Sequence, residues 1–282
     1  MNKFKYLSKQ LIKPSLLFVA LFLALLPSCE TVPETNRTQL ILLDQRTEFS
    51  MGTKAYKDIL KKSKISPDKR AIKIIRRVGR RIAKVVNRPQ YKWEFNLVEN
   101  KTPNAYCLPG GKVGVHTGIL PIAKNEAGLA AVIGHEIAHA VARHGAERMS
   151  QSIIVAIAGE VLAQGLTRNE ADRQAMRAAY GIGSAVAITL PFSRNHELEA
   201  DYLGILYMAR AGYDPREAKK FWQRFSRWGK KEKKSSDFDF LSTHPANKKR
   251  IAQIDDMLVR AMAEYNRSAK IGAGEKLKAG RY

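Results

Sequence analysis

The stretch AAVIGHEIAHAVARHGAERM, residues 130–149, decides the fold, because it combines the pattern of a buried helix with three polar side chains. Small and apolar residues at most of its positions predict a helix that is covered on every side. His135 and His139 are four residues apart and share one helix face, and Glu136 lies about 100° round from His135. Burying these three groups without partners would cost free energy. A bound cation removes that cost, so the stretch predicts a metal site.

The spacing His135, Glu136, His139 is that of an HExxH motif, in which the histidines bind zinc and the glutamate flanks it and holds a water. A catalytic zinc takes three protein ligands and leaves a fourth position for water. The rest of the chain must therefore supply one more ligand for one zinc ion.

The segment NHELEAD, residues 195–201, is the expected source of that ligand. In a helix, Glu197 and Asp201 share a face, whereas Glu199 lies about 200° away and is expected to point to solvent. Glu197 can then bind zinc while Asp201 orients a ligand histidine through its free ring nitrogen. His196 is the alternative third ligand.

Two further histidines have different expected roles. His144 lies about 140° off the face of His139, which favours packing or support of a ligand. His244 lies near the end of a charged segment, residues 229–245, that we expect to be a surface loop or lid. It can therefore close on the zinc as a fourth ligand that blocks water, or be a turn histidine before a helix. If a zinc-bound water attacks a carbonyl here, the tetrahedral oxyanion that forms needs a hydrogen-bond donor besides zinc. Three side chains are candidates for that donor: Arg194, Tyr202 and His244.

The remaining pattern predicts a mostly helical α+β domain. Apolar residues recur at helical spacing over 67–88, the segments 91–100 and 105–118 alternate as short strands, and a final amphipathic helix covers 246–265. We expect a small antiparallel sheet that packs on the HExxH helix. Asn104 and Ala105 are expected at an exposed sheet edge, where they would bind the backbone of an extended substrate.

The N-terminal region predicts export. A basic start precedes an apolar run, residues 16–26, that is too short to span a bilayer comfortably, which is typical of a signal peptide. The run ends in LLPSC, which resembles the lipidation box of bacterial lipoproteins and would place a lipid on Cys29; ordinary signal cleavage is the alternative. The predicted organisation is a signal peptide (1–28), a tether (29–39), a zinc peptidase domain (40–265) and a basic flexible tail (266–282).

Charge and cysteine content exclude several classes of protein. With Cys29 lipidated, Cys107 stands alone, so neither an internal disulfide nor a cysteine zinc site is expected. The formal net charge of +23 is spread along the chain, and an exported protein seldom meets nucleic acid. We therefore expect no nucleic-acid partner.

Several segments together resemble the CAAX-prenyl-protease-like family of zinc metallopeptidases, in particular bacterial periplasmic lipoproteins related to beta-barrel assembly-enhancing proteases. The matching segments are QLILLDQRTEFSMGTKAYKDIL, PNAYCLPGGKVGVHTGIL, AAVIGHEIAHAVARHGAERM, SRNHELEADYLGILYMARAGYDP and THPANKKRI. The resemblance implies a zincin-like (gluzincin) fold. The site residues that it implies are His135, His139 and Glu197 as zinc ligands, Glu136 as catalytic base and Asp201 as support.

The expected function is hydrolysis of peptide bonds by a zinc endopeptidase. The resemblance implies substrates that are unfolded or misassembled envelope proteins, on the periplasmic side of a bacterial cell envelope, with the lipid on Cys29 held in the outer membrane. The alternative is a lipoprotein chaperone or scaffold that holds such chains in a latched and rarely active protease site.

Overall fold

A computed structural model of the chain describes residues 29–166, 192–231, 244 and 248–277, with side chains for all of these except 158–166. The predicted signal peptide and most of the predicted lid lie outside these ranges. Cys29 is exposed, and its lipidation stays a prediction. The longer helices described are α2 (Gln45–Lys62), α3 (Lys69–Val86), α5 (Glu126–Val141), α6 (His144–Leu166), α9 (Arg194–Arg210), α10 (Arg216–Lys231) and α12 (Lys248–Arg267).

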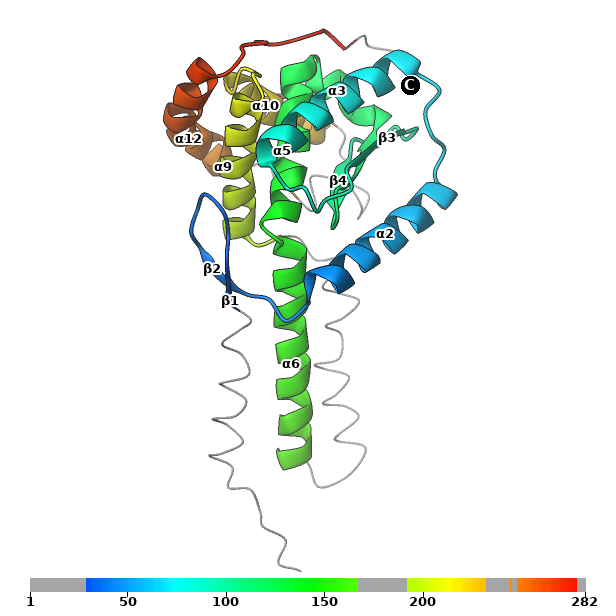
Figure 1. Cartoon of the computed structure of the whole chain (residues 1–282), viewed down its shortest axis with the longest axis vertical. Coiled ribbons are helices and arrows are strands. Elements are labelled where there is room, and N and C mark those ends of the chain that lie inside the picture. Colours follow the sequence, from blue (N-terminus) through cyan, green and yellow to red (C-terminus); the bar gives the residue numbers. More distant parts are fainter. Residues whose placement is uncertain (1–28, 167–191, 232–243, 245–247, 278–282) are drawn as a thin grey trace, which may run out of the picture.

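Helix α5 is the centre of the domain, and all of its residues are buried. It begins where the side chain of Asn125 accepts a hydrogen bond from the amide of Gly128, which satisfies one of the free amides of the first turn. The short helices η2 (Thr117–Ile119) and α4 (Leu120–Ala123) lead into it. Helices α3, α9 and α10 pack around α5, and α12 covers α9 (Figure 1). The expected mostly helical α+β fold is confirmed.

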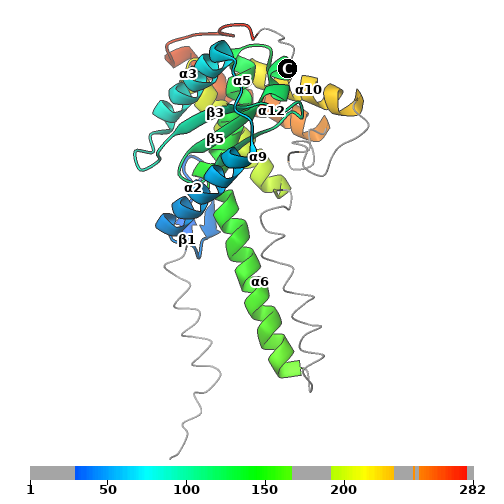
Figure 2. The same ribbon diagram turned by 90° about the vertical axis from the view of Figure 1, so that its right-hand side faces the viewer.

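The sheet is small but mixed. Its strands are β3 (Glu94–Val98), β4 (Ala105–Leu108) and β5 (Lys112–His116), in the order β3-β5-β4 (Figure 2). Gly110 and Gly111, both at positive φ, turn the chain between β4 and β5, which are therefore antiparallel. Because β5 inserts beside β3, these two strands are parallel, and the expectation of a wholly antiparallel sheet is wrong. Helix α3 packs on β3, and α5 packs on β4.

The segment expected as a tether is folded. Strands β1 (Cys29–Thr31) and β2 (Thr38–Leu40) form an antiparallel pair, which we call the N-terminal hairpin. Val32 in its turn is fully buried, and the side chain of Gln39 donates to the carbonyl of Ala142 beyond the end of α5. Burial and side-chain bonds attach this segment to the domain, where the polar composition suggested a free linker.

The C-terminal segment is also held, where a flexible tail was expected. Backbone bonds join Ile271 to Gly212 and Glu275 to Glu126, and the Glu275 carboxylate pairs with Arg70. These bonds tie Ile271 to the turn after α9 and Glu275 to the start of α5, and 278–282 lie outside the described residues.

Helix α6 projects from the domain in both views (Figures 1 and 2). Ile153, Ile154, Val155 and Ile157 are each more than a third exposed, so the domain does not cover this apolar part of α6. Among the described residues, we find no helix with both the length and the apolar character needed to cross a bilayer.

The crossing of α5 and α9 depends on two glycines. A Cβ added at Gly204 would lie 2.7 Å from the amide nitrogen of His135, and one added at Gly134 would lie 2.8 Å from the carbonyl oxygen of Gly204. We expect Gly204→Ala to lower the free energy of unfolding by about 1–3 kcal/mol, because the two helices must separate. Urea denaturation measures this. The control is Gly145→Ala in α6, where an added Cβ meets nothing within 4 Å; an equal loss there would contradict the prediction.

Candidate metal centre

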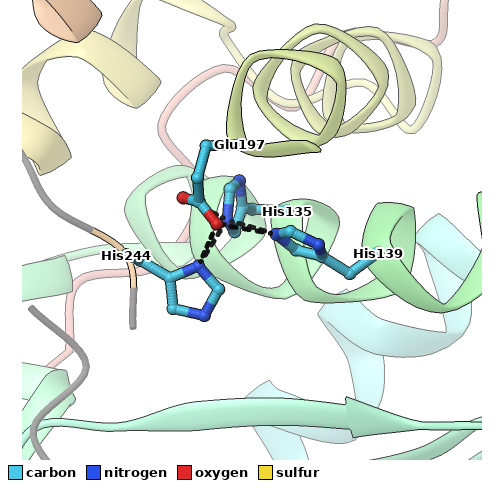
Figure 3. Close-up of side chains that lie close together, drawn as sticks. All are labelled: His135, His139, Glu197 and His244. Carbon is cyan, nitrogen blue, oxygen red and sulfur yellow. Dashed lines mark hydrogen bonds and ion pairs between the residues drawn. The ribbon is translucent and has the colours of Figure 1, made fainter. Parts of the chain in front are cut away.

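Two helices and one distant residue build a buried cluster. Helix α5 supplies His135 and His139, α9 supplies Glu197, and His244 approaches from the opposite side (Figure 3). One ligand atom from each of the four lies within 4.8 Å of the others. Oxygen Oε1 of Glu197 is 3.3 Å from Nε2 of His139 and 2.8 Å from Nδ1 of His244.

The cluster fits zinc. Three imidazoles and a carboxylate are a donor set that zinc takes. Burial lowers the pKa of His135 and of His139, which favours the neutral form that binds a metal. Their Nε2 atoms lie 3.1 Å apart, and Nδ1 of His135 faces Asp201 at 3.0 Å. Because a carboxylate only accepts hydrogen bonds, His135 carries its proton on Nδ1 and turns the lone pair of Nε2 into the cluster. A cation at the centre satisfies these facing atoms.

Arg250 was not predicted as a site residue, although it lies within the quoted segment THPANKKRI, residues 243–251. Its guanidinium is buried, pairs with Glu197 at 2.7 Å and Asp201 at 2.6 Å, and lies 3.9 Å from the centre of the Trp222 ring. Burial opposes ionisation of Asp201, but Arg250 and His135 outweigh it and lower the pKa of this carboxyl. Arg250 therefore keeps Asp201 charged and in position against His135, and it also pairs with Glu197.

Glu136 stands beside the cluster. Burial raises the pKa of its carboxyl to about 7, and His244 partly offsets that effect. Its Oε1 is buried without a hydrogen bond in the part of the chain that the structure describes, and lies 3.7 Å from Nε2 of His244. A carboxyl with a pKa near neutrality is suited to accept a proton and to return it.

A cleft of about 350 Å³ opens onto this carboxyl. Asn104 and Ala105 line it together with Glu136 and His139, so the two residues expected to bind substrate lie at the same opening. Strand β4 pairs with β5 along one edge, and no described strand pairs with its other edge. The ring of Phe192 also lines the cleft and stacks on His139, with ring centres 3.9 Å apart.

Several candidates lie elsewhere. His196 pairs with Glu147 at 3.0 Å and is outside the cluster, so Glu197 is better placed as the third ligand. The hydroxyl of Tyr202 bonds to Arg260 in α12, and Arg194 is exposed at the start of α9. Of the three candidates for the oxyanion, only His244 lies at the cluster.

The expectation that Glu199 points to solvent is wrong. Its side chain is buried and bonds to Thr35, Arg37 and His144. Helical spacing correctly places Glu199 on the side of α9 away from Glu197. That side does not face solvent, because the N-terminal hairpin and α6 cover it. His144 lies behind His139, as a supporting residue would.

Comparison with known families decides the classification. The model of peptidase family M48 matches residues 70–258, which contain both α5 and α9 with the cluster. The chain belongs to peptidase family M48. The expectation of a zinc metalloendopeptidase is thereby confirmed, and the metal cluster fits one zinc ion per chain.

Similar M48 peptidases include mitochondrial proteins. The chain is 37% identical to the mitochondrial metalloendopeptidase OMA1 of Schizosaccharomyces pombe over 238 residues, which cover 83% of this chain and 68% of that one. It is 32% identical to OMA1 of Saccharomyces cerevisiae over 258 residues, covering 85% and 72%. It is 26% identical to the beta-barrel assembly-enhancing protease of Yersinia pestis over 234 residues, covering 81% and 47%.

These relatives correct the expected location. The two yeast proteins, at 37% and 32% identity, are mitochondrial and exceed the bacterial protease in similarity. The prediction of a bacterial cell envelope, with the protein on the periplasmic side and anchored to the outer membrane, is therefore wrong. Its basis was the resemblance of the first 29 residues to a lipoprotein signal and of the later segments to bacterial periplasmic lipoproteins. Residues 1–28 lie outside the described structure.

Proposed function

We propose that this M48 peptidase hydrolyses peptide bonds of unfolded or misassembled polypeptides, with His135, His139 and Glu197 as zinc ligands and Glu136 as the catalytic base. The observation that carries the proposal is the position of the buried Glu136 carboxyl, between the four-residue cluster and the cleft. A proton acceptor, a metal site and a cleft for substrate thus meet at one point.

Each residue has a chemical role in this proposal. Zinc held here would acidify a water and polarise the scissile carbonyl. Glu136 takes the proton of the attacking water and later passes it to the leaving amine. Asp201 holds His135 in the tautomer that binds the metal, and Arg250 holds Asp201 and Glu197 in place.

The free edge of β4 supports a preference for extended chains. A peptide that adds a strand there would bond through its backbone beside Asn104 and Ala105, which selects for an unfolded conformation more than for particular side chains. Apolar residues such as Met51 and Phe192 also line the cleft and would receive apolar side chains of the substrate.

Cleavage of casein tests the proposal, with a compact folded protein as the substrate control. We expect the zinc-loaded protein to cut casein and to leave the folded control intact. A chelator should stop cleavage and added zinc should restore it. Cleavage that continues after zinc has been removed would contradict the proposal.

His244 lies where it can regulate this site. Its Nδ1 is 3.2 Å from Nε2 of His135 and 2.8 Å from Glu197, and His244 also lines the cleft that opens onto Glu136. We propose that His244 is a fourth ligand in a resting state. This arrangement also favours a second candidate function, a chaperone that holds unfolded chains in the cleft and rarely cuts them.

We expect His244→Ala to raise the rate of casein cleavage, because the water position is then free. The rate is measured with zinc-loaded protein. The control is His116→Ala, since His116 bonds to the backbone of Thr102 and is not part of the cluster. An unchanged or lower rate in His244→Ala would contradict the resting-state proposal and leave His244 as a candidate for oxyanion stabilisation.

A further inference from the structure

The zinc ligand His139 has a second hydrogen-bonding side. Its Nδ1 lies 2.9 Å from Nδ1 of His144, and Nε2 of His144 lies 2.9 Å from Oε2 of Glu199. Because the carboxylate only accepts, His144 carries its proton on Nε2 and offers Nδ1 as an acceptor. His139 then donates from Nδ1, which leaves the lone pair of its Nε2 directed at the cluster. The position of Glu199 thus fixes the tautomers of two successive histidines.

The N-terminal hairpin holds Glu199. Thr35 donates its hydroxyl proton to Oε1 of Glu199, and Nε of Arg37 donates to Oε2 at 2.8 Å. The hairpin lies beside α9 in Figure 1, although these bonds join residues more than 160 positions apart. The N-terminal hairpin therefore contacts Glu199, which supports the metal ligand His139 through His144.

Arg37 joins two buried carboxylates. Its Nη1 and Nη2 donate to the two oxygens of Glu147 at 3.0 and 2.9 Å, while its Nε serves Glu199. Glu147 in turn lies 3.0 Å from Nε2 of His196, whose ring stacks on His144 with centres 4.3 Å apart. Without the guanidinium the two carboxylates would repel each other in a poorly solvated site. Of the bonds described above, Glu199 would then keep only those to Thr35 and His144, and the repulsion would displace it from the position that fixes His144.

We propose that Arg37 and Glu199 are positioning residues for zinc, which act on the ligand His139 through His144. This rests on the proposed function, in which His139 binds the metal. Retention of zinc is then coupled to the placement of the N-terminal hairpin. A displacement of the hairpin would weaken the metal site without contact with substrate.

Zinc affinity tests this coupling. We expect Arg37→Gln and Glu199→Gln each to raise the dissociation constant for zinc several-fold and at most about 10–100-fold, which is the usual effect of removing a direct partner of a metal-binding histidine, because both residues act on His139 through His144. The matched control is Glu34→Gln in the turn of the same hairpin, where Glu34 pairs with Arg210 and Arg260 and has no contact with His144 in the described structure. The dissociation constant is measured by competition with a chromophoric chelator, and the unfolding temperature of each zinc-free variant is measured alongside.

The outcomes separate positioning from general support of the fold. The proposal requires that Glu34→Gln changes zinc affinity less than about 2-fold, and that Arg37→Gln adds little in the Glu199→Gln background, because the two residues act in series. Equal loss of zinc affinity in Arg37→Gln and Glu34→Gln would overturn it, as would fully additive effects in the double variant. Absence of stoichiometric zinc from the wild type would instead overturn the proposed function.

Discussion

Glu136→Gln is expected to lower the rate of casein cleavage about 10²–10⁴-fold while the protein still binds one zinc ion. The amide matches the carboxylate in shape but cannot accept a proton from water. Glu136 is not one of the four clustered ligands, so the zinc content should not change. Cleavage and zinc content are measured on the same preparation.

The matched control is Glu126→Gln, an equally conservative change at a buried acid of the same helix. Glu126 lies at the start of α5 and bonds to Arg77 and Tyr213, outside the cluster. We expect this variant to keep its cleavage rate when folded. A Glu136→Gln protein that cuts casein as fast as Glu126→Gln would exclude Glu136 as the base.

Arg250→Met is expected to lower the free energy of unfolding of the zinc-free protein by about 3–5 kcal/mol. The change leaves the carboxylates of Glu197 and Asp201 buried and removes the cation that both contact. The methionine retains part of the packing on Trp222, so the loss reports mainly on charge. Zinc should recover part of this loss, because it pairs with Glu197 when bound.

The control for this variant is Arg260→Met in the same helix, α12. Arg260 is about half exposed and pairs with Glu34, and exposed pairs contribute about 1 kcal/mol or less. Urea denaturation in the presence of a chelator compares the two. If Arg250→Met were no more destabilising than Arg260→Met, Arg250 would not be the buried counter-ion of the zinc site.

The part of the site that the sequence predicted depends on helical periodicity. His135 and His139 share a face of one helix, and Glu197 and Asp201 share a face of another, so each pair follows from spacing alone. When two histidines and two carboxylates are buried in this way, they have few partners for their hydrogen bonds and charges except one another. The structure accordingly places Asp201 against His135 and Glu197 against His139.

The roles of the residues that the sequence analysis missed depend on which element packs against a given helix face. The spacing gave the direction of Glu199 but not the hairpin that covers it, because Arg37 is 162 positions away in the chain. Arg250 reads as one more basic residue in a basic chain until α12 is placed against α9. The parallel pairing of β3 and β5 was not predicted for a similar reason. Alternation of apolar and polar residues indicates a strand but does not specify the order of strands in the sheet.

Zinc K-edge X-ray absorption of the purified wild-type protein tests most directly whether this cluster is the metal site. We predict one zinc per chain with only nitrogen and oxygen ligands at about 2.0–2.2 Å, contributed by His135, His139, Glu197 and, in the resting state, His244. Substoichiometric zinc, or a sulfur ligand at about 2.3 Å that would implicate Cys107 in the neighbouring cleft, would contradict the account.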